Sequence, residues 1–121
     1  MANILIVDDS VTMRHMIEFT LEKAGHSITT AENGKAALTA CEKLRFDLVI
    51  TDINMPGMSG IELIKELRMQ HAMRTKPILV LTTESDAGKK AEGRAAGATG
   101  WIVKPFNPQA LLEVLPRVLG N

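Results

Sequence analysis

Residues 48–57, LVITDINMPG, join a short apolar run to a group of turn-forming residues. The run Leu48–Ile50 is rich in β-branched side chains and has no alternating polar residue, which is typical of a strand buried on both faces of a parallel sheet. Asp52 follows this run, and the Asn, Pro and Gly after it favour a turn. Taken alone, Asp52 is better explained as part of that turn, so any functional role for it has to be argued from the other strands.

Three further apolar runs have the same character, namely Ile4–Val7, Ile78–Leu81 and Ile102–Val103. A fifth segment, Ser27–Ala31, alternates apolar and hydroxyl residues and is predicted to be an edge strand. Segments of helical period separate these runs, so strand and helix alternate along the whole chain. This order predicts a doubly wound α/β domain with a five-stranded parallel sheet covered by helices on both faces.

Capping signals mark the starts of three predicted helices. Asn33 is positioned to cap the second, Ser59 with Glu62 forms a capping-box pattern for the third, and Asn107 before Pro108 opens the last. Asp8 or Asp9 could cap the first helix, whose apolar face is predicted to comprise Met13, Met16, Ile17, Thr20, Leu21 and Ala24.

Two features weaken the C-terminal helices. The segment Ala87–Ala96 contains Gly88 and Gly93, each of which costs about 1 kcal/mol relative to Ala in a helix, so this helix is expected to be mobile. Pro116 is expected to kink or end the last helix, because proline lacks the backbone donor that a helix interior needs.

Length and charge narrow the range of functions. With 121 residues the chain is expected to form one domain spanning residues 1–121, with no attached DNA-binding output. Its 14 basic and 14 acidic side chains give a formal net charge of zero, which argues against a protein that binds nucleic acid or an anionic membrane through a general positive charge. The first half is acidic and the second half basic, however, so the charge is separated along the chain.

The expected location is the cytoplasm. The single Cys41 cannot form an internal disulfide, which suits a reducing compartment. The N-terminal residues lack the basic flank and the length of a signal peptide, and no apolar run approaches the length of a membrane span. The protein is expected to be a monomer.

Polar side chains follow four of the five predicted strands. Asp8 and Asp9 follow the first, Asp52 the third, Thr82 the fourth and Lys104 the fifth. Each has an ordinary explanation: a helix cap, a turn, a strand residue or a surface lysine. Because the carboxyl ends of parallel strands meet at one edge of the sheet, however, all of them are expected to lie together at the position where such sheets bind ligands.

A group of three carboxylates and one lysine favours a bound cation. Two carboxylates about 5 Å apart repel by roughly 3 kcal/mol at an effective dielectric near 20. Oxygen ligands select a hard ion, and a site that also admits phosphate indicates Mg²⁺. The three histidines lie away from the strand ends and are expected to be solvated.

This arrangement closely resembles the receiver domain of bacterial two-component response regulators, in particular the single-domain, CheY-type chemotaxis regulators. The resemblance extends over the whole chain and is carried by Asp8-Asp9, the Asp52–Gly57 segment, Thr82 and Lys104-Pro105-Phe106. It implies a flavodoxin-like (βα)5 fold with strand order 2-1-3-4-5. It also implies a phosphoaspartate switch that signals through contacts with other proteins.

The resemblance assigns Asp52 as the phosphoacceptor. It implies that Mg²⁺ is held by Asp9, Asp52 and the backbone carbonyl of Asn54, with Asp8 acting through water. Lys104 would supply a positive charge to the phosphoryl group. The implied protein is not an enzyme but a phosphoacceptor that assists its own phosphorylation and dephosphorylation.

The resemblance also assigns a switch. Thr82 would bind a phosphoryl oxygen, and Trp101 occupies the position of the family's aromatic switch residue, where Tyr or Phe is usual. The implied partners are a CheA-like sensor histidine kinase and an output protein, such as a flagellar motor switch or a phosphatase, that contacts the fourth helix, fifth strand and fifth helix. A phosphorelay intermediate and a phosphate sink remain open as roles.

Three other families fit the residues less well. A haloacid-dehalogenase-type phosphatase needs a second acid two residues after its nucleophile, where this chain has Asn54. A flavodoxin-like FMN module needs a phosphate-binding loop after the first strand, where Asp8 and Asp9 would repel phosphate. The segment Gly88–Arg94 lacks the Lys-Ser/Thr pair of a P-loop.

Overall fold

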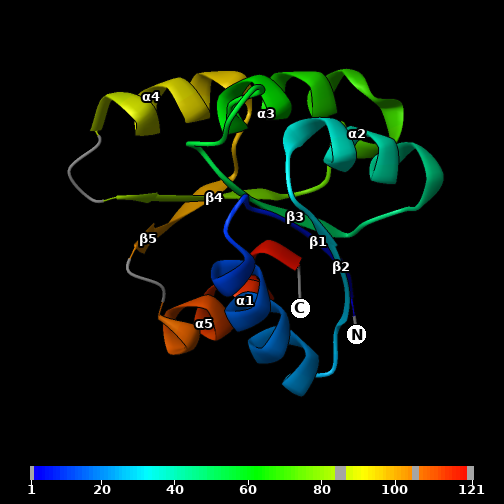
Figure 1. The fold of residues 1–121 in the computed structure, drawn as a ribbon, viewed down its shortest axis with the longest axis vertical. Coiled ribbons are helices and arrows are strands. Elements are labelled where there is room, and N and C mark those ends of the chain that lie inside the picture. Colours follow the sequence, from blue (N-terminus) through cyan, green and yellow to red (C-terminus); the bar gives the residue numbers. More distant parts are fainter. Residues whose placement is uncertain (1, 84–86, 105–106, 120–121) are drawn as a thin grey trace.

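The computed structural model describes residues 2–83, 87–104 and 107–119. Strands and helices alternate from end to end, with one short 3₁₀ helix before the fourth strand (Figure 1). The strands are β1 Asn3–Val7, β2 Ser27–Ala31, β3 Leu48–Asp52, β4 Ile78–Thr83 and β5 Gly100–Lys104. The helices are α1 Val11–Lys23, α2 Gly34–Lys43, α3 Gly60–Met69, η1 His71–Met73, α4 Ala87–Ala96 and α5 Pro108–Leu119.

All five strands run parallel in one sheet, in the order β2-β1-β3-β4-β5. The predicted doubly wound sheet and the strand order implied by the family resemblance are therefore confirmed. The alternating segment Ser27–Ala31 lies at an edge, as expected, because one face of an edge strand needs less burial. The apolar run Ile4–Val7 of the central strand β1 is buried, and all five residues of β3 are buried.

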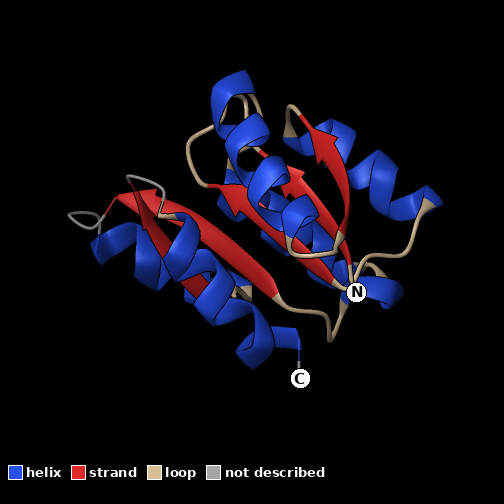
Figure 2. Ribbon diagram, turned by 90° about the horizontal axis from the view of Figure 1, so that it is seen from below, coloured by secondary structure: helices blue, strands red, loops and turns tan. Residues whose placement is uncertain are grey.

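Helices cover both faces of the sheet (Figure 1). One face carries α1 and α5, and the other carries α2, α3 and α4, so alternate strand residues enter two separate cores. Figure 2 shows the twist of the sheet between these two helical layers. Cys41 of α2 is buried, and this burial raises the pKa of its thiol to about 11, so the side chain is unreactive at neutral pH.

Local capping residues position the helices as the sequence indicated. The Asn33 side chain accepts from Ala36 N at 2.8 Å, and the reciprocal capping box of Ser59 and Glu62 is present at α3. Asn107 Oδ1 accepts from the first turn of α5. The cap of α1 is Ser10, whose hydroxyl accepts from Met13 N. Asp8 and Asp9 are therefore not the N-cap residue of α1.

Two residues of the predicted apolar face of α1 differ from the sequence prediction. Met16 and Ala24 are exposed, because the buried stripe of α1 is narrow and is centred on Ile17 and Leu21. For Pro116 the prediction was a kink or an end of the last helix; α5 does not end there but continues to Leu119. The residue lies in the last turns of α5, where few backbone hydrogen bonds remain to be lost.

Arg68 of α3 ties together segments that are distant in sequence. Its guanidinium donates to the carbonyl of Gly97 from both Nε and Nη2, at 3.0 and 2.7 Å. The same group donates to the carbonyls of Met73 and Lys76, both at 2.6 Å. Burial lowers the pKa of Arg68, although the guanidinium stays protonated at any physiological pH. One side chain thus holds the C-terminal end of α4 against α3 and the start of β4.

His26 is hydrogen-bonded rather than simply solvated, contrary to expectation. Its ring nitrogen Nδ1 accepts from the backbone N–H of Ala2 at 3.0 Å, which requires the neutral imidazole. Burial lowers the pKa of His26 below its ordinary value of 6.5. The folded protein therefore binds this proton less tightly than the unfolded chain does.

A pH-dependent loss of stability follows from His26. A group with a lowered folded pKa contributes its full stability above the unfolded pKa and loses it as the pH falls through the folded pKa. Between about pH 7.5 and about pH 5, the free energy of unfolding should fall more for the wild type than for His26→Gln. Denaturant titrations at both pH values test this. Equal losses in the two proteins would contradict the assignment.

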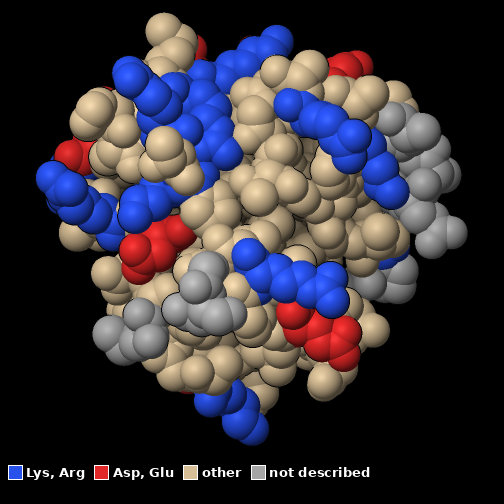
Figure 3. Space-filling model, turned by 180° about the vertical axis from the view of Figure 1, so that it is seen from behind, with Lys and Arg blue, Asp and Glu red and all other residues tan. Residues whose placement is uncertain are grey.

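The balanced net charge conceals local separation on the surface. On the face shown in Figure 3, Lys and Arg side chains gather over the upper part, while Asp and Glu form small separate groups.

Among the residues that the structure describes, no helix is long and apolar enough to cross a membrane.

Candidate functional site

Strand register brings the predicted acidic residues together. In the β1–β3 ladder Ile4 pairs with Leu48 and Val7 with Thr51, so the next step places Asp8 beside Asp52. In the β4–β5 ladder Lys104 is the partner of Thr83, at the same end of the sheet. By strand alternation Asp8, Asp52 and Lys104 belong to the face covered by α1 and α5.

Asp8 is the most deeply buried of the described carboxylates, with 1% of its surface exposed. Its Oδ1 accepts from Ser10 N at 2.9 Å, whereas its Oδ2 is buried and has no hydrogen-bond partner among the described residues. Burial raises the pKa of Asp8, and the negative charges of Asp52 and Asp9 raise it further. The N–H of Ser10 and the charge of Lys104 act in the opposite direction. A buried, unpartnered carboxylate oxygen of this kind calls for a positive ligand.

Asp52 ends β3 and is 5% exposed. Its Oδ1 accepts from the N–H of Ile53 at 2.8 Å and forms an ion pair with Lys104 Nζ at 3.0 Å. Both contacts use the same oxygen, and they fix the orientation of the carboxylate. The predicted pairing of a strand-end lysine with this cluster is therefore present in the structure.

Three carboxylates form one compact group, which we call the acidic cluster: Asp8, Asp9 and Asp52. One ligand oxygen from each lies within 4.8 Å of the others, the only such group of potential metal ligands among the described residues. Asp9 is exposed, so the cluster is open to solvent on one side. The donors are all carboxylate oxygens and one of them is a buried atom without a partner, so the residues fit a hard divalent cation such as Mg²⁺.

A close backbone approach shapes the loop that follows Asp52. Gly60, the first residue of α3, donates its N–H to the carbonyl of Ile53 at 2.8 Å. A Cβ at position 60 would collide with the Asp52 carbonyl oxygen and would lie 2.8 Å from Ile53 Cα. Only glycine permits this approach, so Gly60 sets how the β3–α3 loop returns to the end of β3.

Thr82 and Trp101 belong to the opposite face of the sheet from Asp52. Thr82 is buried and pairs with Val103, while Trp101 pairs with Val80, so by alternation all four face the layer formed by α2, α3 and α4. The indole ring is partly buried at the edge of the sheet. A displacement of Thr82 toward the acidic cluster would therefore change the packing along the row that contains Trp101.

The structure brings together most of the predicted site residues. Asp8, Asp9, Asp52 and Lys104 meet at one point, and Thr82 lies near the end of the neighbouring strand. The side chain of Asn54 is exposed, and its predicted role concerns the backbone carbonyl only. Pro105 and Phe106 of the predicted motif lie outside the described residues.

The sequence did not predict the role of Gly60 at the site or the contact that Arg94 makes with Trp101. Gly60 could have been noticed as a glycine in the first turn of a capped helix. Arg94 was expected only as part of the output face on the fourth helix. The approach of its guanidinium carbon to within 5.0 Å of the Trp101 ring centre gave no signal, because the contact joins residues on two different elements.

The chain is similar to known proteins over almost its full length. The response regulator receiver domain family matches residues 4–116. A chemotaxis protein CheY homolog of Campylobacter jejuni is 43% identical over 122 residues, which cover 98% of this chain and 92% of that protein.

Solved structures extend the likeness to three dimensions. The chemotaxis protein CheY4 of Vibrio cholerae has a TM-score of 0.94 and 52% identity, covering 98% of both chains. The receiver domain of a sensor histidine kinase from Pseudomonas aeruginosa has a TM-score of 0.91 and 29% identity, covering 99% of this chain and 98% of that one. In that receiver domain a magnesium ion is coordinated in the active-site cleft.

Proposed function

This chain belongs to the response regulator receiver domain family, and from that premise we propose that Asp52 accepts a phosphoryl group from a sensor histidine kinase during chemotaxis signalling. The family and the CheY relatives make it a phosphoaspartate response regulator, a signalling protein of a two-component system. The observation that supports the choice of Asp52 is its position: a buried strand-end carboxylate in the acidic cluster, paired with Lys104.

The proposed reaction is an in-line transfer to a carboxylate oxygen of Asp52. That oxygen forms the new bond to phosphorus, the bond between phosphorus and the donor nitrogen or acyl oxygen breaks, and the donor keeps the bonding electrons. Oδ1 already accepts from Ile53 N and pairs with Lys104, which leaves Oδ2 as the proposed nucleophile. Catalysis in such transfers rests on positioning and on neutralising negative charge.

The acidic cluster is the proposed magnesium site. Asp9 and Asp52 would bind the ion together with the Asn54 carbonyl, and Asp8 would contribute through its unpartnered buried oxygen. When bound, the ion neutralises phosphoryl oxygens and offsets the repulsion among the three carboxylates. The ion found in the related receiver domain supports this choice of cation.

Lys104 and Thr82 are proposed to respond to the phosphoryl group. The phosphoryl group carries about −1.5 to −2 charges and replaces the single negative charge of the Asp52 carboxylate, which gives Lys104 a stronger partner than the carboxylate alone. Thr82, on the neighbouring strand, would hydrogen-bond a phosphoryl oxygen. These differential contacts supply the free energy that shifts the protein between two states, and Trp101 is the proposed reporter of the shift.

The proposed output surface is formed by α4, β5 and α5. Two hollows flank Trp101 there, one of about 770 Å³ against α4 and one of about 420 Å³ between β5 and α5. Val103 is exposed and lines both hollows. A surface that contains the switch residue and apolar hollows suits a partner protein, which we propose is a component of the chemotaxis system.

The test is incubation with a small acyl phosphate and Mg²⁺, followed by intact-mass measurement. We expect a gain of one phosphoryl group that depends on the metal and reverses with time. Transfer of the phosphoryl group from Asp52 to a histidine-containing protein would instead indicate a phosphorelay intermediate or phosphate sink. Steady release of phosphate from varied phosphate monoesters, with no gain in mass, would overturn the proposal and favour a phosphatase.

A further inference from the structure

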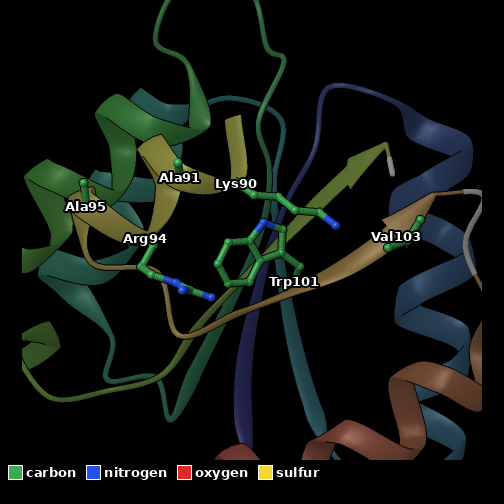
Figure 4. Close-up of a pocket in the computed structure, with 6 residues that line it drawn as sticks. All are labelled: Lys90, Ala91, Arg94, Ala95, Trp101 and Val103. Carbon is green, nitrogen blue, oxygen red and sulfur yellow. The ribbon is translucent and has the colours of Figure 1, made fainter. Parts of the chain in front are cut away.

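Arg94 of α4 lies over the indole ring of Trp101. The distance from its guanidinium carbon to the ring centre is 5.0 Å, which is within the range of a cation–π contact. Figure 4 shows Arg94 and Lys90 extending from α4 beside the ring. Lys90 and Arg94 are four residues apart, about one helical turn, so both side chains belong to the same face of α4.

The space around the Trp101 ring allows the contact with Arg94 to affect where the ring lies. Trp101 borders a hollow of about 770 Å³ whose walls on the α4 side include the small side chains of Ala91 and Ala95. Methyl groups at these two positions leave space next to the indole, so close packing alone does not determine the position of the ring. The Arg94 guanidinium above the ring face favours one position of the indole ring.

The base of Arg94 is held in place by the rest of the fold. Arg94 lies three residues before Gly97, whose carbonyl accepts two hydrogen bonds from Arg68. This end of α4 is therefore tied to α3. These hydrogen bonds restrain the backbone near Arg94 in a helix whose glycines predict mobility, so less backbone entropy is lost when the guanidinium contacts the ring.

We propose that Arg94 is a positioning residue that holds Trp101 in its partly exposed position while Asp52 is unmodified. This inference rests on the proposed function, because it assigns Trp101 to the switch. Movement of the ring after phosphorylation breaks the contact, so Arg94 favours the unmodified state. Cation–π contacts at exposed sites correspond to about a two- to fivefold change in an equilibrium constant.

The first experiment observes the ring directly. Trp101 is the only tryptophan, so incorporation of 5-fluorotryptophan gives a single ¹⁹F NMR probe. In the unmodified protein, Arg94→Gln should move this resonance toward its position in the phosphorylated wild type. Arg94→Lys, which keeps a cation, should give a smaller shift, and the matched control Lys90→Gln should keep the wild-type position.

The second experiment measures the switch equilibrium. We expect Arg94→Gln to bind beryllofluoride, a phosphoryl mimic, about two- to fivefold more tightly than the wild type in the presence of Mg²⁺. Lys90→Gln removes one charge from the same helix face and should leave this affinity unchanged. An unchanged or weaker affinity in Arg94→Gln, or an equal gain in Lys90→Gln, would overturn the proposal.

The two experiments separate failure of the inference from failure of the proposed function. A wild type that neither gains a phosphoryl group nor binds beryllofluoride would contradict the proposed function. A wild type that is modified without any change in the Trp101 resonance would contradict the switch role of Trp101. If the wild-type resonance responds and Arg94→Gln behaves as the wild type in both states, only the role of Arg94 is wrong.

Discussion

Asp52→Asn should abolish the metal-dependent gain of one phosphoryl group, lowering the rate of modification by roughly four orders of magnitude or more. An amide has no anionic oxygen to attack phosphorus. The substitution preserves shape, and its oxygen can still accept from Ile53 N, as Asp52 Oδ1 does at 2.8 Å. Intact-mass measurement after incubation with the acyl phosphate and Mg²⁺ gives the result.

Asp9→Asn is the matched control, because it also replaces a carboxylate of the acidic cluster with an amide. Asp9 is exposed and is assigned to the ion rather than to the nucleophile. The Asp9→Asn protein should therefore still be modified, more slowly, and higher Mg²⁺ should restore part of the rate. Full modification of Asp52→Asn, with the group mapped to another residue, would contradict the assignment of Asp52.

Gly60→Ala should damage both the fold and the site. The new Cβ would collide with the Asp52 carbonyl oxygen, so the backbone of either α3 or β3 must move. Overpacking of this kind costs about 1–3 kcal/mol, and more where backbone atoms are the obstacle. We expect a loss near the upper end of that range in denaturant unfolding. We also expect slower modification of Asp52, because its own peptide group is displaced.

Gly57→Ala provides the comparison, since it lies in the same loop. Gly57 has a φ of +79°, but no atom beyond its own residue and its two chain neighbours lies within 4 Å of the place that an added methyl group would take, so its substitution carries only a conformational cost. This cost is about 1–2 kcal/mol for a residue in the left-handed region. Gly57→Ala should thus be destabilised less than Gly60→Ala and should keep a near-normal rate of modification. A rate for Gly60→Ala equal to that of the wild type would show that the close approach does not position Asp52.

Much of the architecture follows from local sequence patterns. The β-branched runs predict buried parallel strands, because such side chains fit a pleated surface covered on both faces. Asn33, Ser59 and Asn107 cap helices through hydrogen bonds to residues two or three positions away. Interactions of such short range depend little on the rest of the molecule, so they can be predicted before the fold is known.

The acidic cluster was also predictable, for a topological reason. The carboxyl ends of parallel strands lie at one edge of the sheet, so Asp8, Asp52 and Lys104 come together once the strands are known to be parallel. The sequence did not distinguish a capping role from a site role for Asp8 and Asp9. The structure assigns the cap to Ser10 and leaves one oxygen of Asp8 buried without a partner among the described residues.

By itself, therefore, the sequence determined the order of the elements, the parallel sheet and the group of side chains at its carboxyl edge. Only the tertiary structure decided which atoms meet: Arg68 with the Gly97 carbonyl, Gly60 with the peptide of Asp52, and Arg94 with the Trp101 ring. The two kinds of feature differ in the sequence separation of the residues that interact. Strand and cap patterns are set by neighbours along the chain, whereas these contacts join separate elements and depend on how the helices pack on the sheet.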